Sequence, residues 1–281
     1  MSGSKAREAD PFPAWFASLE ARHLSTLTFS EVRRALRALS SLYVERRGRL
    51  PSGAALDGAG KRAAVALFYG PLHFLLVREI VRSLEAARRS PARIVDLGCG
   101  TGASGAAWAL ECGSRPPITG LDRNPWALEE ARRTLKDLQL RGEARRADVA
   151  RIRFRGRGES ILAAFTLNEV PPEERGFLLA RFLEAAQRGA DILVIEPVAR
   201  GATPWWDEWT PAFLAAGGRS DAWSFPADLP ERLRLLDKAA GLDHRTLKGK
   251  SLWLPGSSQG STERQSTPRS PAPLAKKATP L

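Results

Sequence analysis

The apolar positions in the first third of the chain recur at helical spacing. Val32, Leu36, Leu39 and Tyr43 form one stripe, and Arg33, Arg34 and Arg37 lie off it. Thr28 and Glu31 precede the stripe at the spacing of a capping box, in which each side chain caps the other's backbone N–H. We therefore predict a helix that begins after Thr28 and has one basic face.

Two more helical segments are expected in the same part of the chain. Residues 12–27 fit a short helix, and residues 61–89 fit another after a Gly-, Pro- and Ala-rich loop at 48–60. We expect the second to be interrupted near Gly70-Pro71, because proline lacks an N–H. Its apolar stretch, 63–77, also contains His73 and is too short for a membrane span, so no membrane partner is expected. Residues 12–90 thus predict a helical N-terminal lobe.

From residue 91 the pattern alternates between short apolar strands and amphipathic helices. The predicted strands are residues 93–97, 118–122, 144–148, 160–166 and 191–196, and the helices between them lie near 103–112, 125–139 and 172–188. A helix near 228–240 and a final strand pair near 243–254 follow. This alternation predicts an α/β domain over residues 91–254, with a doubly wound, mostly parallel sheet and helices on both faces.

The composition of the ends and the few metal-ligating residues narrow the class of protein. Residues 1–11 and 255–281 are too polar to bury a core and are predicted to be disordered. The N-terminus has no apolar run typical of a signal peptide, which favours a cytoplasmic location. No metal site is expected, because the two cysteines and three histidines are widely spaced: Cys99, Cys112, His23, His73 and His244.

The segment Arg93-Ile-Val-Asp-Leu-Gly-Cys-Gly-Thr-Gly102 carries the clearest chemical signal. A buried strand runs into three glycines, Gly98, Gly100 and Gly102, which let bare backbone approach a bound nucleotide-like molecule. Together with Gly105 and Asp122 the segment also matches the NAD fingerprint. Asp96 argues against NAD, because its negative charge would lie near the pyrophosphate.

Three motifs in order resemble those of class I S-adenosylmethionine-dependent methyltransferases. Val95-Asp96-Leu97-Gly98-x-Gly100-x-Gly102 resembles their first motif, Asp122-Arg-Asn-Pro-Trp-Ala-Leu the second, and Arg145-Arg-Ala-Asp-Val149 the third. The resemblance implies that Asp96 faces the cationic methionine end, that Asp122 accepts from both ribose hydroxyls and that Asp148 accepts from the adenine amino group. The alternative is an α/β domain whose acids merely cap helices.

The resemblance thus implies S-adenosyl-L-methionine as the cofactor. The residues expected to bind it are Asp96, Gly98, Cys99, Gly100, Gly102, Asp122, Arg123, Asp148 and Val149.

The methyl acceptor is expected where strands four and five end. Asn168 and Glu169 follow strand four and are the candidate catalytic residues: Asn168 could accept a hydrogen bond from an exocyclic amine, and Glu169 could act as a base or orienting acceptor. Alternatively, both could cap the helix that begins at Pro171. Neither strand end contains a cysteine, which argues against RNA 5-methylcytosine chemistry.

Two further segments could contact an acceptor. Trp205, Trp206 and Trp209 follow strand five and could stack on a flipped base, although packing in the core is favoured for two of the three. Arg151, Arg153 and Arg155 alternate with Ile152 and Phe154. If this segment is extended, the arginines lie on one face and could grip phosphates; a solvated strand face is the alternative.

The net charge of +12 lies mainly outside the α/β domain. Residues 1–90 carry +7 (15 Lys and Arg against 8 Asp and Glu), residues 91–254 carry +2 (24 against 22), and residues 255–281 carry +3 (4 against 1). Basic flanks are typical of proteins that bind a polyanion, here most plausibly RNA, and equally of proteins whose charge only confers solubility.

A narrower resemblance rests on three short segments. Lys61–His73, Leu167-Asn-Glu-Val-Pro171 and Ile195-Glu-Pro-Val resemble the mitoribosomal small-subunit methyltransferase-like family and its bacterial relatives, which associate with small ribosomal subunits. Many members carry cysteines for an iron–sulfur cluster after strand five. Residues 215–224 contain none here, so no cluster is expected.

Three hypotheses follow. The first is a methyltransferase that acts on RNA, with ribosomal RNA as one candidate. The second is a methyltransferase of small molecules, with the helical lobe as a lid. The third is a non-catalytic ribosome-assembly factor that binds S-adenosylmethionine.

Overall fold

The computed structural model describes residues 9–45, 56–199, 201 and 203–257, with side chains left undescribed at 41–45. Most of the predicted disorder, at 1–8 and 258–281, lies outside this part, as do the side chain of Tyr43 and most of the loop predicted at 48–60.

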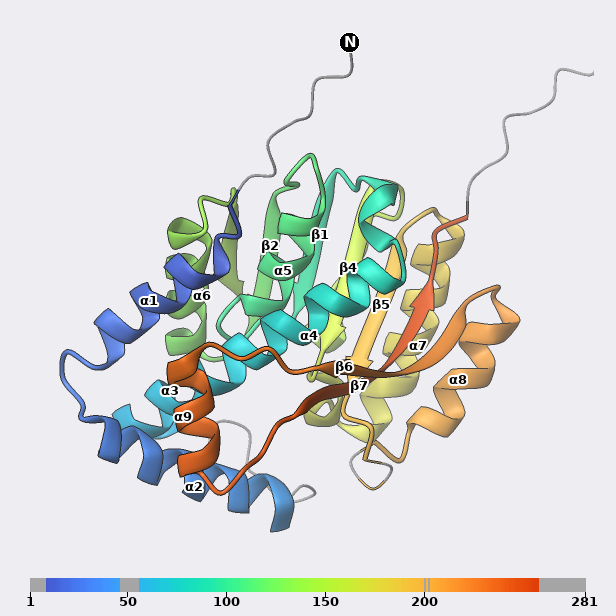
Figure 1. Ribbon diagram of the computed structural model, residues 1–281. Coiled ribbons are helices and arrows are strands. Elements are labelled where there is room, and N and C mark those ends of the chain that lie inside the picture. The colour runs from blue at the N-terminus through green and yellow to red at the C-terminus, as the bar shows by residue number, and fades with distance from the viewer. Residues whose placement is uncertain (1–8, 46–55, 200, 202, 258–281) are drawn as a thin grey trace, which may run out of the picture.

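A seven-stranded sheet forms the centre of the molecule (Figure 1). The strands are β1 (Arg93–Leu97), β2 (Ile118–Asp122), β3 (Gly142–Arg146), β4 (Glu159–Ala164), β5 (Asp191–Glu196), β6 (Arg219–Pro226) and β7 (Thr246–Leu254). Their order is β3-β2-β1-β4-β5-β7-β6. The first five are parallel, and β7 is antiparallel to both β5 and β6. The predicted doubly wound, mostly parallel sheet is confirmed.

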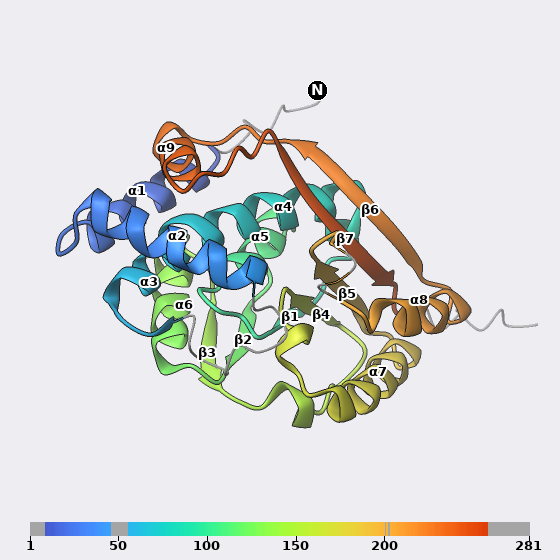
Figure 2. The same cartoon turned by 90° about the horizontal axis from the view of Figure 1, so that it is seen from below.

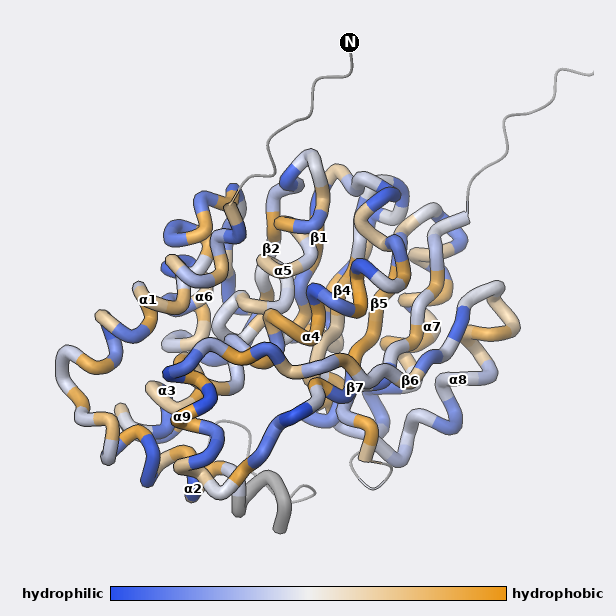
Figure 3. The backbone as a smooth tube through the Cα atoms, in the orientation of Figure 1, coloured by the Kyte–Doolittle hydropathy of each residue, from blue (hydrophilic) through white to orange (hydrophobic). Residues whose placement is uncertain are grey.

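Helices cover both faces of this sheet (Figures 1 and 2). One face carries α4 (Gly70–Ser83), α5 (Ala103–Glu111) and α6 (Pro125–Asp137), and the other carries α7 (Pro172–Gln187) and α8 (Trp206–Ala215). Figure 3 shows apolar residues concentrated on the central strands and on α4, which packs against them. The strands β4 and β5 are buried along their whole length, as expected of parallel strands covered on both faces.

The N-terminal lobe packs against α4. It consists of α1 (Phe12–His23), α2 (Phe29–Glu45) and α3 (Ala59–Ala64), and α9 (Glu231–Ala239) lies beside it in Figure 2. The predicted capping box is present: the Thr28 N–H donates to Glu31 Oε2 at 2.7 Å, and the Glu31 N–H donates to Thr28 Oγ1 at 3.3 Å. Phe74 of α4 contacts Phe12 and Trp15 of α1, with ring centroids 5.0 and 5.2 Å apart.

The α-helix is interrupted just before Gly70-Pro71, as expected, but the chain stays helical. It passes from α3 through one π-helical segment, η2 (Val65–Tyr69), directly into α4, and this irregular segment accommodates Pro71, which has no N–H to donate. In the described part of the chain, Ala59–Ser83 is the one helix long and apolar enough to cross a membrane, which corrects the expectation of too short a stretch. Most of its apolar window, 72%, is buried inside the protein.

Three predicted strand boundaries were wrong. The third strand ends at Arg146, two residues earlier than expected, and β4 ends at Ala164 rather than 166. The final pair does not lie within 243–254: β7 pairs with β6, which precedes α9. The sequence of β6 alternates exposed and half-buried residues, so it lacks the apolar run that marked the central strands.

We expect Phe74→Ala to destabilise the protein by about 3–5 kcal/mol, because Phe74 is fully buried and joins α4 to the N-terminal lobe. Phe177→Ala is the matched control: Phe177 is 68% exposed, and its loss should change stability by less than about 0.5 kcal/mol. Urea unfolding measures both. Equal effects of the two substitutions would contradict this packing.

Candidate functional site

The glycine turn between β1 and α5 forms the centre of the carboxyl edge of the sheet. Gly98, Gly100 and Gly102 all have positive φ, at +60°, +51° and +76°. A Cβ on Gly98 would lie 2.3 Å from Thr166 Cγ2, and one on Gly102 would lie 3.1 Å from Ala131. A Cβ on Gly100 would meet no atom within 4 Å. The turn is therefore packed against protein at Gly98 and Gly102 and open at Gly100.

Asp96 lies beneath this turn. Its side chain is 1% exposed, and its Oδ2 accepts a hydrogen bond from the Gly105 N–H in α5 at 3.0 Å. Burial raises the pKa of Asp96 to about 7; the Gly105 hydrogen bond opposes this, and the charge of Asp122 adds to it. A Cβ on Gly105 would lie 2.7 Å from the carboxyl oxygen, so the contact requires glycine. Asp96 thus ties β1 to α5 and places a carboxyl group directly under the turn.

Asp122 ends β2 beside the open part of the turn. Its Oδ2 accepts from the Gly100 N–H at 2.9 Å, and its Oδ1 accepts from the Asn124 N–H at 2.8 Å. Asn124 in turn caps α6 by accepting from the Trp126 N–H at 2.9 Å. The half-buried carboxylate is therefore held at the rim of the turn, where the sequence places the ribose-binding acid.

Asp148 lies two residues beyond the end of β3, because that strand begins and ends two residues earlier than predicted. It caps a short 3₁₀ turn, η4 (Val149–Arg151), through the Ala150 N–H at 3.1 Å. Its Oδ1 also accepts from Arg123 Nη2 at 2.6 Å, and this bond lowers the pKa of Asp148. The structure thus brings Arg123, Asp148 and buried Val149 together on the β2–β3 side of the turn.

Cys99 is buried below the turn rather than exposed on it. Its Sγ lies 2.9 Å from where a Cβ on Gly120 of β2 would stand, and burial raises the pKa of its thiol well above the ordinary value. The packing at this position requires a small side chain and does not depend on a reactive thiol.

Asn168 does not cap α7, so that alternative is wrong. The N-cap of α7 is Pro171, which forms no side-chain cap. Asn168 instead donates from Nδ2 to Glu196 Oε2 at 3.2 Å and accepts at Oδ1 from Trp205 Nε1 at 2.9 Å. Its amide oxygen, which was expected to face an acceptor amine, is thus already engaged in joining the ends of β4 and β5 to α8.

Glu196 is a site residue that sequence reasoning missed. It ends β5, is fully buried, and accepts from the Leu167 N–H at 3.2 Å. Burial raises its pKa to about 8; the Leu167 hydrogen bond and the charge of Lys250 oppose the shift. The Glu-Pro string after strand five was the available signal, but its role depends on tertiary contacts with residues 28 positions earlier.

Glu169 is exposed, unlike Asn168's partner Glu196. The pKa of Glu169 is raised, first by the protein atoms that surround the carboxyl group and then by the charge of Asp122, while Arg123 lowers it. The charge of Glu169 in turn raises the pKa of Glu196. Glu169 therefore interacts with charged groups near the ends of both β2 and β5.

The three tryptophans are packed in the protein. Trp205, Trp206 and Trp209 are 6%, 7% and 1% exposed, and the rings of Trp205 and Trp209 lie 4.9 Å apart. Lys250 Nζ lies 4.3 Å from the Trp206 ring. Core packing was expected for two of them and is found for all three, so none offers a free face for base stacking.

The arginine segment after β3 is not part of a strand, but its exposed and buried residues still alternate. Arg151, Arg153 and Arg155 are exposed, and Phe154 is buried. A hollow of about 610 Å³ lies there, lined by Arg151, Ile152, Arg153, Phe154, Arg181, Glu184 and Arg188. Arg181 donates to the Ala150 carbonyl and Arg188 to that of Phe154, so α7 holds the segment in place.

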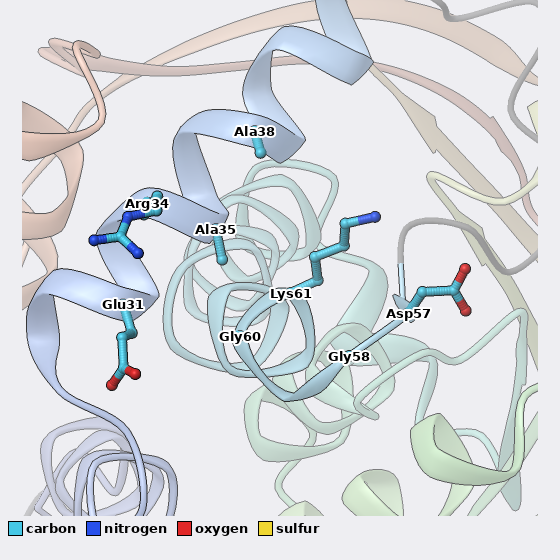
Figure 4. A pocket seen from close by; sticks show the side chains of 8 residues that line it. All are labelled: Glu31, Arg34, Ala35, Ala38, Asp57, Gly58, Gly60 and Lys61. Atoms are coloured by element: carbon cyan, nitrogen blue, oxygen red, sulfur yellow. The ribbon is translucent and has the colours of Figure 1, made fainter.

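A second hollow of about 350 Å³ lies between α2 and α3 (Figure 4). There Gly60 lets the helices approach: its Cβ would lie 3.2 Å from that of Ala35. Figure 4 shows the charged side chains of Glu31, Arg34 and Lys61 diverging from this contact rather than converging. It is a packing groove that contains none of the predicted site residues.

Comparison with known proteins identifies the domain. Residues 94–189 match the family model described as a methyltransferase domain. Carboxy-S-adenosyl-L-methionine synthase of Chromohalobacter salexigens is 31% identical over 146 residues, covering 49% of this chain and 53% of that protein. 2-Ketoarginine methyltransferase of Streptomyces arginensis is 30% identical over 203 residues, covering 71% and 54%. The chain spans about half the length of these curated relatives.

A solved structure from Nostoc punctiforme, provisionally described as an O-methyltransferase, shares the fold. Its TM-score is 0.50 at 12% identity, with 82% of this chain and 72% of that chain covered. Fold, matched segment and relatives together define a class I S-adenosylmethionine-dependent methyltransferase domain. S-adenosyl-L-methionine is the cofactor of this class, and the open face at Gly100 beside the Asp122 carboxylate fits it.

We expect Gly98→Ala to lose stability and Gly100→Ala to lose mainly cofactor affinity. The first meets Thr166 at 2.3 Å and should unfold or strongly destabilise the protein. The second costs only about 1–2 kcal/mol for its left-handed backbone, but its methyl group would enter the open face and weaken cofactor binding. Thermal unfolding and calorimetric titration with S-adenosylmethionine separate the two effects.

Gly113→Ala is the control, since its Cβ also meets nothing within 4 Å and its φ is not positive. Undiminished cofactor affinity in Gly100→Ala would place the cofactor elsewhere.

The raised pKa of Glu196 predicts a pH dependence of stability. Its ordinary value is 4.5 and its folded value about 8, so the folded state keeps a proton that the unfolded state releases. Stability should therefore fall as pH rises between these values, by up to about 1.4 kcal/mol per pH unit for one proton. In Glu196→Gln this slope should flatten, while Glu208→Gln, an exposed control, should keep it.

Urea unfolding at a series of pH values measures the slope. A pH-independent change in the free energy of unfolding caused by the glutamine does not matter, because only the slopes against pH are compared. Parallel curves for wild type and Glu196→Gln would show that Glu196 is ionised throughout.

Proposed function

We propose that this protein transfers a methyl group from S-adenosylmethionine to a small-molecule acceptor. The observation that carries this proposal is the arrangement at the glycine turn: an open face at Gly100, with the Asp122 carboxylate fixed beside it and Asp96 beneath it. Bare backbone together with two carboxylates suits a cofactor that is cationic and carries ribose hydroxyls.

Different residues would bind different parts of the cofactor. Asp122 accepts from the ribose hydroxyls, Asp148 and Val149 hold the adenine, and the negative charge of Asp96 favours the cationic end. The cofactor supplies an electrophilic methyl group on a sulfonium. Because methyl transfer is an in-line displacement, the protein contributes mainly alignment of the acceptor.

Two observations favour a small acceptor. Both curated relatives are named for small molecules, 2-ketoarginine and a carboxylated S-adenosylmethionine. The tryptophans that could have stacked on a nucleobase are buried. The helical lobe packs on α4, beside the glycine turn, where it could cover a small acceptor.

RNA remains a second candidate, favoured by the exposed arginines. The hollow between α7 and the segment after β3 contains four arginines, Arg151, Arg153, Arg181 and Arg188, against one acid, Glu184. Such a surface attracts a phosphate backbone. The resemblance of Lys61–His73 and Leu167–Pro171 to the mitoribosomal methyltransferase-like family supports the same candidate, with the small ribosomal subunit as partner.

We expect Asp122→Asn to weaken S-adenosylmethionine binding by about tenfold to a hundredfold, the worth of hydrogen bonds to a charged acceptor. Calorimetric titration measures this. Asp137→Asn is the control, since Asp137 pairs with Arg22 at 3.1 Å on the surface of α6. Unchanged affinity in Asp122→Asn would remove Asp122 from the cofactor site.

The acceptor class can be determined with methyl-tritiated S-adenosylmethionine. It is incubated with the protein and with separated metabolite, RNA and protein extracts, and the labelled fraction is identified. Label in the metabolite fraction supports the proposal. Label in RNA, with binding that weakens steeply with salt, supports the second candidate. Cofactor binding without label in any fraction would instead favour a non-catalytic role.

A further inference from the structure

His73 differs from the other two histidines in how its ring is held. His23 Nε2 lies 3.1 Å from Glu130 Oε1, and His244 Nδ1 lies 2.5 Å from Asp237 Oδ1. Each of these rings is thus tied to a carboxylate. Within the described residues, the ring nitrogens of His73 form no hydrogen bond, although its side chain is half-buried. Its imidazole nitrogens are therefore available to a ligand.

The ring of His73 lies at the carboxyl edge, between the glycine turn and the end of β4. It stacks on Phe165 with centroids 3.9 Å apart and an interplanar angle of 16°. The next residue, Thr166, donates from Oγ1 to the Leu97 carbonyl at 2.9 Å, directly before the turn. On the other side, Gly70, one helical turn before His73, packs on Thr101 of the turn: its Cβ would lie 2.9 Å from Thr101 Oγ1.

Phe165 holds a strained conformation to present its ring there. Its φ is +57°, in the left-handed region that a bulky side chain avoids. The Phe165 N–H donates to the Ile195 carbonyl at 2.8 Å, which keeps the residue in this geometry at the β5 side of the edge. Strain of this kind gathers at ligand sites, where the surrounding structure enforces it.

The surroundings keep the imidazole neutral. Burial lowers the pKa of His73 to about 4, so at neutral pH one ring nitrogen is an acceptor. The Tyr69 ring, 6.3 Å from His73, and Phe165 make this wall aromatic. Glu169, the carboxylate expected to act as base, interacts electrostatically with Asp122, Arg123 and Glu196.

We propose that His73 accepts the hydroxyl proton of a planar, phenol-like methyl acceptor that packs along the wall of Tyr69, His73 and Phe165. This rests on the proposed methyl transfer and names its acceptor class. As the acceptor oxygen forms its bond to the methyl carbon, the bond from that carbon to sulfur breaks and the hydroxyl proton passes to the imidazole. The products are the methyl ether, the neutral thioether and an imidazolium, which then releases its proton to water.

Calorimetric titration with 4-nitrophenol in the presence of S-adenosylhomocysteine tests the site. 4-Nitroanisole, the same ring without a hydroxyl proton, is the matched ligand. We expect wild type to bind 4-nitrophenol about three- to tenfold more tightly than 4-nitroanisole, the worth of one hydrogen bond. In His73→Asn this preference should disappear, and in His23→Asn, the histidine control, it should remain.

Loss of 4-nitrophenol absorbance with S-adenosylmethionine present gives the second readout. We expect His73→Asn to slow this methylation by at least about a hundredfold, the usual contribution of a positioned proton acceptor. A separate titration of the wild-type protein with S-adenosylhomocysteine alone distinguishes failure of the methyltransferase proposal from failure of the acceptor proposal. If wild type does not bind it, the methyltransferase proposal fails.

If wild type binds S-adenosylhomocysteine but not 4-nitrophenol, the acceptor class is wrong. If His73→Asn keeps the preference for 4-nitrophenol over 4-nitroanisole, the role of His73 is wrong.

Discussion

The buried hydrogen bond from the Gly105 N–H to the Asp96 carboxylate is the contact on which the functional edge depends. It joins the end of β1 to the first turn of α5 across the glycine turn, so the backbone between them has little freedom. The bond is possible only because residue 105 has no side chain, and the turn above it has positive φ at Gly98 and Gly102, which pack against Thr166 and Ala131. One carboxylate therefore determines where bare backbone faces a ligand.

The ends of β4 and β5 are attached to this turn by a second set of buried polar contacts. Thr166 donates to the carbonyl of Leu97, and Glu196 receives hydrogen bonds from the Leu167 N–H and from Asn168. Burial raises the pKa values of both Asp96 and Glu196, so this edge holds two carboxyl groups that a bound cation would help to ionise. Architecture and electrostatics at the edge thus favour the same positively charged methyl donor.

The parts of the fold that the sequence predicted well are those with strong local signals. The strands β1, β2 and β5 begin and end where their apolar runs do, because they are buried on both faces and flanked by glycine or acidic residues. The predictions of β3 and β6 were wrong because both strands lie at the edges of the sheet and have no buried apolar run. β3 has one buried residue among exposed ones, and β6 mixes exposed and half-buried residues. The predicted interruption near Gly70-Pro71 takes the form of a π-helical segment before the proline, so the helix changes its hydrogen-bonding pattern without ending.

The sequence by itself determined the class of domain and predicted which residues bind the cofactor, since glycines and acids in a βαβ unit act through contacts close along the chain. Only the tertiary structure decided the acceptor side. It buried the tryptophans, turned Asn168 toward Glu196 and Trp205, and brought His73 of α4 onto Phe165 at the end of β4. Those partners lie far apart in the chain, and no periodicity or motif encodes the packing of one helix over one strand end.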